Sequence, residues 1–140
     1  LEAVASRVAV SAAAASAAYR GEAPNLLEDK GMDLGSIRSG ALGRAVHAGD
    51  TVVEDILRYA ARWLGVGIAN AANLLAPDIV VMGGGLDEEM PDLFRDEVEA
   101  VACKRAMPVL RDFKVVVAKL GDDATVTGAA AWASERLSSG

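Results

Sequence analysis

With 140 residues, the chain is long enough for one domain with a real hydrophobic core. Apolar residues make up 52% of it and aromatic residues only 4%, so we expect an aliphatic core rich in alanine. The formal charge of −6 and the pI near 4.7 argue against a nucleic-acid-binding surface, which needs clustered Lys and Arg.

Neither a membrane span nor a disulfide is expected. No stretch approaches the roughly 18 uninterrupted apolar residues of a spanning helix, and no signal peptide opens the chain. A single cysteine, Cys103, cannot form an internal disulfide, and a single histidine, His47, cannot build an ordinary zinc site. The sequence therefore favours a soluble, cytoplasmic protein. Because the chain begins at Leu1 without a methionine and residues 2–6 already favour a helix, we expect the chain to be a piece of something longer.

The first part of the chain is predicted to be helical. Residues 2–19 are rich in alanine and favour a helix, whereas glycines and a proline in residues 21–36 favour a loop that carries a short turn. Ser39 can cap a short helix over residues 39–48, which a glycine closes.

A long helix is predicted over residues 50–75, with Asp50 as its cap and an end before Pro77. Two apolar stripes run along it, so apolar residues cover most of its circumference and we expect burial on more than one side. The stripes are Val52, Ile56, Tyr59, Trp63, Val66 and Asn70, and Val53, Leu57, Leu64 and Ile68.

Strands and helices alternate in the rest of the chain. A strand is predicted over residues 79–82, a helix over about 88–105, a second strand over 113–119 and a last helix over 124–137. The second strand is continuously apolar enough for burial on both faces. This order predicts two parallel strands joined by a crossover helix.

Two strands are too few for the helices that must cover them. We therefore expect the sheet to continue into strands outside this chain. If the fragment is stable alone, it should form oligomers or expose apolar surface.

The most informative motif is the glycine triplet Gly83-Gly84-Gly85, which follows the first strand directly. Glycines at a strand end allow close approach of a ligand, but they also serve a turn that needs positive φ, and both interpretations stay open. The motif is neither a P-loop nor a complete dinucleotide fingerprint. Acidic residues 87–89 would repel a phosphate at the next helix start, so a ribose or base edge fits better.

Other motifs favour structural roles. Gly65 and Gly67 lie inside the long helix, where a small-residue face suits close packing more than ligand contact. Either Asp122 or Asp123 can cap the last helix, and metal binding by the pair is the less favoured interpretation. His47 suits the partial charge at a helix end.

Three segments resemble the ROK family (repressors, open reading frames and sugar kinases). Residues 64–86, which contain the glycine triplet, resemble its hallmark segment, and residues 120–130 resemble its closing motif. The opening residues 1–6 resemble the segment that follows the family's zinc-binding Cys-x-Cys-Gly-x-x-Gly-Cys sequence. The similarity spans nearly the whole chain.

This resemblance implies an α/β fold, the C-terminal part of an actin/hexokinase-like (ribonuclease H-like) sugar kinase with about two parallel strands. Residues 1–48 would form a helical segment near the sugar site and residues 50–140 a nucleotide-side αβαβα unit. ATP with Mg and a hexose would meet in the cleft between two domains. Gly83, Gly84 and Gly85 match the family's nucleotide-binding glycines, and Glu2 matches a glutamate that hydrogen-bonds sugar hydroxyls.

The same resemblance places the catalytic aspartate, the phosphate-binding loop and the zinc ligands upstream of this chain. We therefore expect the isolated fragment to be inactive as a kinase. Three interpretations stay open: part of an ATP-dependent hexose kinase of the glucokinase type, the ligand-sensing and dimerising part of a sugar-responsive repressor, or a separate interaction domain. Family members commonly form homo-oligomers, and no nucleic-acid or membrane contact by this fragment is expected.

Overall fold

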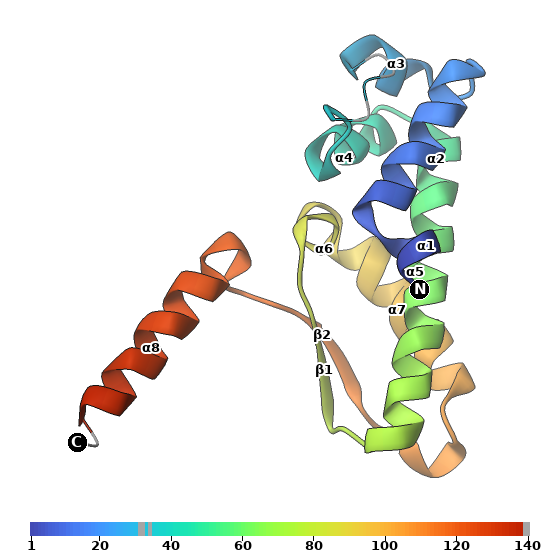
Figure 1. Ribbon diagram of the computed structural model, residues 1–140. Helices are drawn as coiled ribbons and strands as arrows, with labels where there is room; N and C mark the ends of the chain where they lie inside the picture. Colours follow the sequence, from blue (N-terminus) through green and yellow to red (C-terminus); the bar gives the residue numbers. More distant parts are fainter. Residues whose placement is uncertain (31–32, 34, 139–140) are drawn as a thin grey trace.

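The computed structural model describes residues 1–30, 33 and 35–138, and Figure 1 shows their arrangement. In chain order the elements are α1 (Glu2–Ala5), α2 (Arg7–Tyr19), α3 (Pro24–Lys30), α4 (Ser39–His47), α5 (Thr51–Leu75), β1 (Ile79–Met82), α6 (Gly85–Glu89), α7 (Pro91–Arg105), the 3-10 turn η1 (Pro108–Leu110), β2 (Lys114–Val117), the 3-10 turn η2 (Gly121–Asp123) and α8 (Ala124–Ser138).

The two strands form the predicted parallel pair. Ile79 pairs with Lys114 and Met82 with Val117, so the four residues of each strand are in continuous register. Helices α6 and α7 make the connection between the strands. The predicted strand–helix–strand unit is therefore confirmed, with the second strand shorter than residues 113–119.

The core lies between the long helix α5 and the elements around it. Helix α7 runs beside α5, and α1, α2 and α4 also pack against it (Figure 1). Its largest fully buried side chains are aliphatic, as the composition predicts, because the chain has few aromatic residues. They are Leu26, Ile37, Leu42, Leu57, Val10, Val53 and Val98.

The expectation that the second strand is buried on both faces is wrong. Val115 is buried against the helices, but Lys114 and Val116 of the same strand are exposed. Their neighbour Val81 on β1 is 62% exposed. Helices cover one face of the sheet, and nothing in the described part of the chain covers the other.

Helix α5 has one buried stripe and one open one. Val53 and Leu57 are fully buried, as predicted. On the other stripe, however, Tyr59 is 50% and Trp63 is 41% exposed, and Asn70 is exposed as well. The predicted burial on more than one side therefore does not extend to Tyr59 and Trp63, which stay partly exposed.

Several predicted boundaries shift for local reasons. The predicted helix over residues 2–19 breaks at Ser6, whose extended backbone lets its side chain accept a hydrogen bond from the Ala9 N–H at 3.2 Å. The loop predicted over residues 21–36 contains a helix, α3. The helix predicted from residue 88 is divided at Met90, because Pro91 starts a new helix there.

Helix α8 extends away from the other helices (Figure 1). All of its described side chains are exposed, including Trp132 at 62%. A Cβ at Gly128 would meet no atom within 4 Å, so this glycine does not serve close packing within the described residues. No described helix combines the length and apolar character needed to span a membrane.

Candidate functional site

The glycine triplet lies at the carboxyl end of β1 and lines a cavity of about 230 Å³. The walls come from five parts of the chain that are distant in sequence. They consist of Ala5 and Arg7 near the N-terminus, Ser39 at the start of α4, Leu64 of α5, Gly83, Gly84, Gly85, Leu86 and Asp87 after β1, and Phe94 of α7.

Two glycines of the triplet, Gly84 and Gly85, occupy positions that disfavour a side chain. Gly84 has φ +135° and ψ 162°, a backbone conformation that is essentially restricted to glycine. A Cβ at Gly85 would lie 2.7 Å from the Ser39 hydroxyl oxygen, and one at Gly83 would lie 3.4 Å from the Cβ of Ala118. The turn interpretation therefore holds for Gly84, and Gly85 lies close to Ser39 of the chain itself. Close approach of a ligand to the triplet stays a prediction.

Arg7 and Ser39 are cavity residues that the sequence analysis missed. Ser39 was predicted as the cap of α4, but Arg38 is the N-cap, and Ser39 is the first helical residue beside Gly85. Arg7 is the first residue of α2, where the helix dipole disfavours a cation, and no described carboxylate pairs with it. An unpaired cation at a helix start is the signal that could have drawn attention to it.

Asp87 is the one carboxylate in the cavity wall. The residue is 7% exposed, and its Oδ1 has no hydrogen-bond partner among the described residues. Burial raises the pKa of the Asp87 carboxyl above its usual range, and the neighbouring Glu88 carboxylate adds to the shift. The cavity thus combines a buried acceptor, a glycine backbone and an exposed arginine.

Glu2 does not join this group of residues. It lies in the first turn of α1 and is exposed, whereas Ala5 and Arg7 of the same region line the cavity. Its match to a sugar-binding glutamate remains a prediction.

The remaining motifs have the structural roles that were expected. A Cβ at Gly65 would lie 2.8 Å from the carbonyl oxygen of Val98, so this glycine brings α5 and α7 into contact. His47 Nδ1 lies 2.7 Å from the carbonyl oxygen of Gly43 in the same helix. Cys103 is half-buried, and burial raises the pKa of its thiol.

No group of three or more His, Cys, Asp or Glu side chains suited to a metal ion occurs among residues 1–30, 33 and 35–138.

The last helix starts at Ala124, directly after η2. The backbone N–H of Asp123 donates to the carbonyl of Leu120, and the side chain of Asp122 lies outside the described part.

Comparison with known proteins identifies the relatives of this chain. The sequence model of the ROK family matches residues 1–136. A putative xylose repressor of Caldicellulosiruptor sp. (strain Rt8B.4) is 39% identical over 101 residues, which are 71% of this chain and 24% of the repressor. A glucokinase of Streptomyces coelicolor is 37% identical over 97 residues, 65% of this chain and 29% of the glucokinase.

The fold matches a solved structure of the same family. The crystal structure of a ROK family glucokinase from Streptomyces griseus, in complex with glucose and AMPPNP, superposes with a TM-score of 0.79 at 30% identity. The match covers 94% of this chain and 43% of that one. The chain thus spans less than half the length of the relatives that it matches. Its fold is that of part of an actin/hexokinase-like sugar kinase, and the chain belongs to the ROK family.

Proposed function

We propose that residues 1–140 are the C-terminal portion of a cytoplasmic ROK sugar kinase that phosphorylates a hexose with ATP. Residues 50–140 supply the nucleotide side of the cleft, and residues 1–48 lie near the sugar. The observation that carries this proposal is the cavity at the carboxyl end of β1, lined by Gly83, Gly84 and Gly85. Ligands of open α/β sheets bind at this end of the strands.

The cavity suits the nucleoside end of ATP. The glycine backbone allows a ribose or a base edge to come close, because no Cβ stands in the way. Asp87 and the neighbouring acidic residues disfavour a phosphate at that end, whereas Arg7, which also lines the cavity, offers a cation. The relative from Streptomyces griseus was crystallised with glucose and AMPPNP, which supports a hexose and ATP as ligands of this chain's parent.

The cavity residues do not form a magnesium site of their own. Mg²⁺ prefers an octahedral shell of oxygen ligands, and Asp87 is the one carboxylate in the wall. Magnesium would therefore reach the site on the phosphates of the nucleotide. Since phosphoryl transfer needs groups that the family resemblance places upstream, we expect this chain alone to bind nucleotide without turnover.

Calorimetric titration of the chain with AMPPNP tests the proposal. We expect saturable binding that Gly84→Ala weakens at least tenfold, because the new Cβ strains the backbone at φ +135°. Gly49→Ala is the matched control, since Gly49 also has positive φ, at +101°, but lies outside the cavity. Circular dichroism would establish that both variants fold. Equal loss in the two variants, or no binding by the unaltered chain, would contradict the nucleotide role.

A sugar-responsive repressor is the second candidate, supported by the 39% identity to a putative xylose repressor. In that case this portion would sense ligand and dimerise. The two candidates differ in the parent polypeptide, where a helix-turn-helix segment would identify the repressor and an intact catalytic aspartate without one the kinase. Hexose phosphorylation by the parent polypeptide would decide for the kinase.

Self-association follows from the open sheet face and the exposed apolar residues of α8, and we expect a homo-oligomer. Sedimentation velocity over a range of concentrations tests this. A monomer at every concentration, with no binding of an apolar dye, would contradict it.

A further inference from the structure

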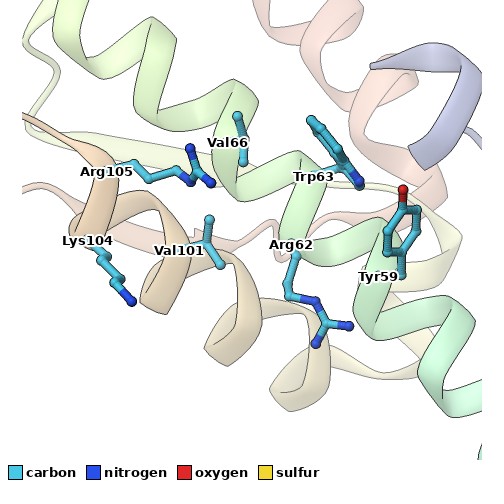
Figure 2. A pocket seen from close by; sticks show the side chains of 7 residues that line it. All are labelled: Tyr59, Arg62, Trp63, Val66, Val101, Lys104 and Arg105. Carbon is cyan, nitrogen blue, oxygen red and sulfur yellow. The ribbon is translucent and has the colours of Figure 1, made fainter.

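A groove between α5 and α7 differs in composition from the rest of this acidic chain. Its volume is about 450 Å³, within the range of small-molecule sites. Two aromatic rings, Tyr59 and Trp63, line it together with three cationic side chains, Arg62, Lys104 and Arg105 (Figure 2). It shares no lining residue with the glycine cavity.

The floor of the groove is fixed by the contact between the two helices. Gly65 has no side chain, so Val101 of α7 packs directly against it, and a Cβ at Gly65 would lie 2.9 Å from that of Val101. Val66 and Val101 therefore form an apolar floor, and the longer side chains one turn away stand above it as walls.

The positive charge of the groove is only partly neutralised by the described residues. Arg62 lies 3.7 Å from Glu97, but the same carboxylate already accepts a hydrogen bond from Arg58 at 2.7 Å. Lys104 and Arg105 have no carboxylate within 4.0 Å among the described residues. Their place in the last turn of α7 suits the helix dipole, which explains cations there but not the neighbouring aromatic pair.

The aromatic pair is placed to hold a flat ring. Tyr59 and Trp63 meet edge to face, with ring centroids 6.3 Å apart, and both stay about half exposed. They belong to the apolar stripe for which the sequence predicts burial. In the described part of the chain, no element packs over this stretch of α5 closely enough to bury it. Aromatic rings offer a large apolar contact area, and an arginine offers charge-assisted hydrogen bonds to an anion.

In Figure 2 the two rings lie toward one end of the groove, and the Arg105 guanidinium extends toward Val66 at the other. Trp63 and Val66 are separated by about 4.5 Å along the helix axis. A ligand that reaches both must therefore carry its charge within a bond or two of its ring.

We infer that this groove binds a small anion with a planar ring, whose phosphate or carboxylate pairs with Arg105 while the ring lies against Trp63 and Tyr59. The site lies on the α5–α7 surface and is independent of the proposed nucleotide cavity. Charge complementarity selects an anion, because the lining of the groove includes three cationic side chains and no carboxylate.

The fluorescence emission of Trp63, which lines the groove, can report binding directly. The chain has two tryptophans, so Trp132→Phe leaves Trp63 as the sole source of tryptophan emission. Phenyl phosphate is the probe, with phenol as the uncharged control and inorganic phosphate as the control without a ring. We expect a saturable change in Trp63 emission with phenyl phosphate, at an affinity at least about tenfold higher than for either control.

Two double variants test whether phenyl phosphate binding depends on the cations of the groove or only on the net charge of the chain. Lys104→Gln with Arg105→Gln should weaken phenyl phosphate binding at least about tenfold. Arg95→Gln with Lys119→Gln removes the same charge from one partly exposed and one exposed position outside the groove and should leave phenyl phosphate binding unchanged. Equal weakening in both pairs, absence of saturation, or phenol binding as well as phenyl phosphate would overturn the inference. A Trp63 response to an acidic helical peptide but not to phenyl phosphate would make this a protein interface and would also overturn it.

Discussion

The carboxylate of Asp50, immediately before α5, accepts a hydrogen bond from the backbone N–H of Leu26 at the start of α3, at 2.9 Å. Asn25 adds a side-chain N–H at 2.7 Å and a backbone N–H at 3.3 Å. Asp50 was predicted to cap α5, yet its side chain makes no capping bond there. It caps α3 instead, across 24 residues of chain.

Removing this carboxylate should destabilise the fold. Asp50 is 3% exposed, so Asp50→Ala leaves buried N–H groups without partners, and we expect a loss of about 1–3 kcal/mol. Urea unfolding followed by circular dichroism measures it. Asp55→Ala, at an exposed position on the same helix, should stay within about 0.5 kcal/mol. Equal stability of the two variants would show that the Asp50 bonds contribute nothing.

Gly65 should tolerate no side chain. In Gly65→Ala the new methyl would meet the Val98 carbonyl oxygen at 2.8 Å, and we expect the overpacking to lower stability by about 1–3 kcal/mol. Gly128→Ala is the control, because open space surrounds that position and the alanine favours the helix. Thermal unfolding of both variants compares them. An unchanged melting temperature for Gly65→Ala would mean that α5 and α7 can separate freely.

Arg7 should contribute to nucleotide affinity through its charge. Arg7→Gln removes the unpaired cation from the glycine cavity, and we expect AMPPNP affinity to fall roughly tenfold, the effect of one charge-assisted hydrogen bond. Arg20→Gln, at the other end of the same helix, removes a cation that pairs with Glu22 at 2.6 Å outside the cavity. Calorimetry at two salt concentrations should give a smaller salt dependence for Arg7→Gln than for Arg20→Gln. The same salt dependence in both would argue against a phosphate contact.

Asp87 should make stability depend on pH. Burial raises its pKa in the folded state, so the native protein binds the proton more tightly than the unfolded chain does. Stability is then greatest below the unfolded pKa of about 3.9, and it falls as pH rises through the folded pKa. Asp87→Asn should remove this fall. Urea titrations from pH 4 to pH 8 measure it, and parallel curves for the two proteins would contradict the assignment.

Helix α8 should be dispensable for the stability of the rest. Because its described side chains are exposed, a chain that ends at residue 123 should unfold within about 0.5 kcal/mol of the full chain. Denaturation with urea, followed through Trp63 emission in the shortened chain and in the full chain carrying Trp132→Phe, gives the comparison. A larger loss would mean that α8 packs on the body of the protein in solution.

Local patterns account for what the sequence predicted correctly. The strand before Gly83, the long helix before Pro77 and the parallel pair all follow from residues that are adjacent in the chain. The family comparison confirms the resemblance drawn from those motifs. The role of Gly65 was predictable for the same reason, since a glycine inside a helix indicates close packing.

Contacts between distant segments account for what was missed. The carboxylate of Asp50 accepts hydrogen bonds from Asn25 and Leu26, and no local sequence pattern predicts these partners. Arg7 and Ser39 become cavity residues because α2 and α4 approach the end of β1 in space. The exposure of Trp63 was missed because hydrophobic periodicity reports which residues suit burial, and not whether a partner is present.

The two-stranded sheet has a consequence for how this chain meets other polypeptides. In the part of the chain described, β1 and β2 pair with each other alone, so each strand turns one row of backbone N–H and C=O groups outward. A strand from another polypeptide can add at either margin without breaking a bond that already exists. The number of strands in the complete sheet therefore depends on which other polypeptide segments pair with β1 and β2.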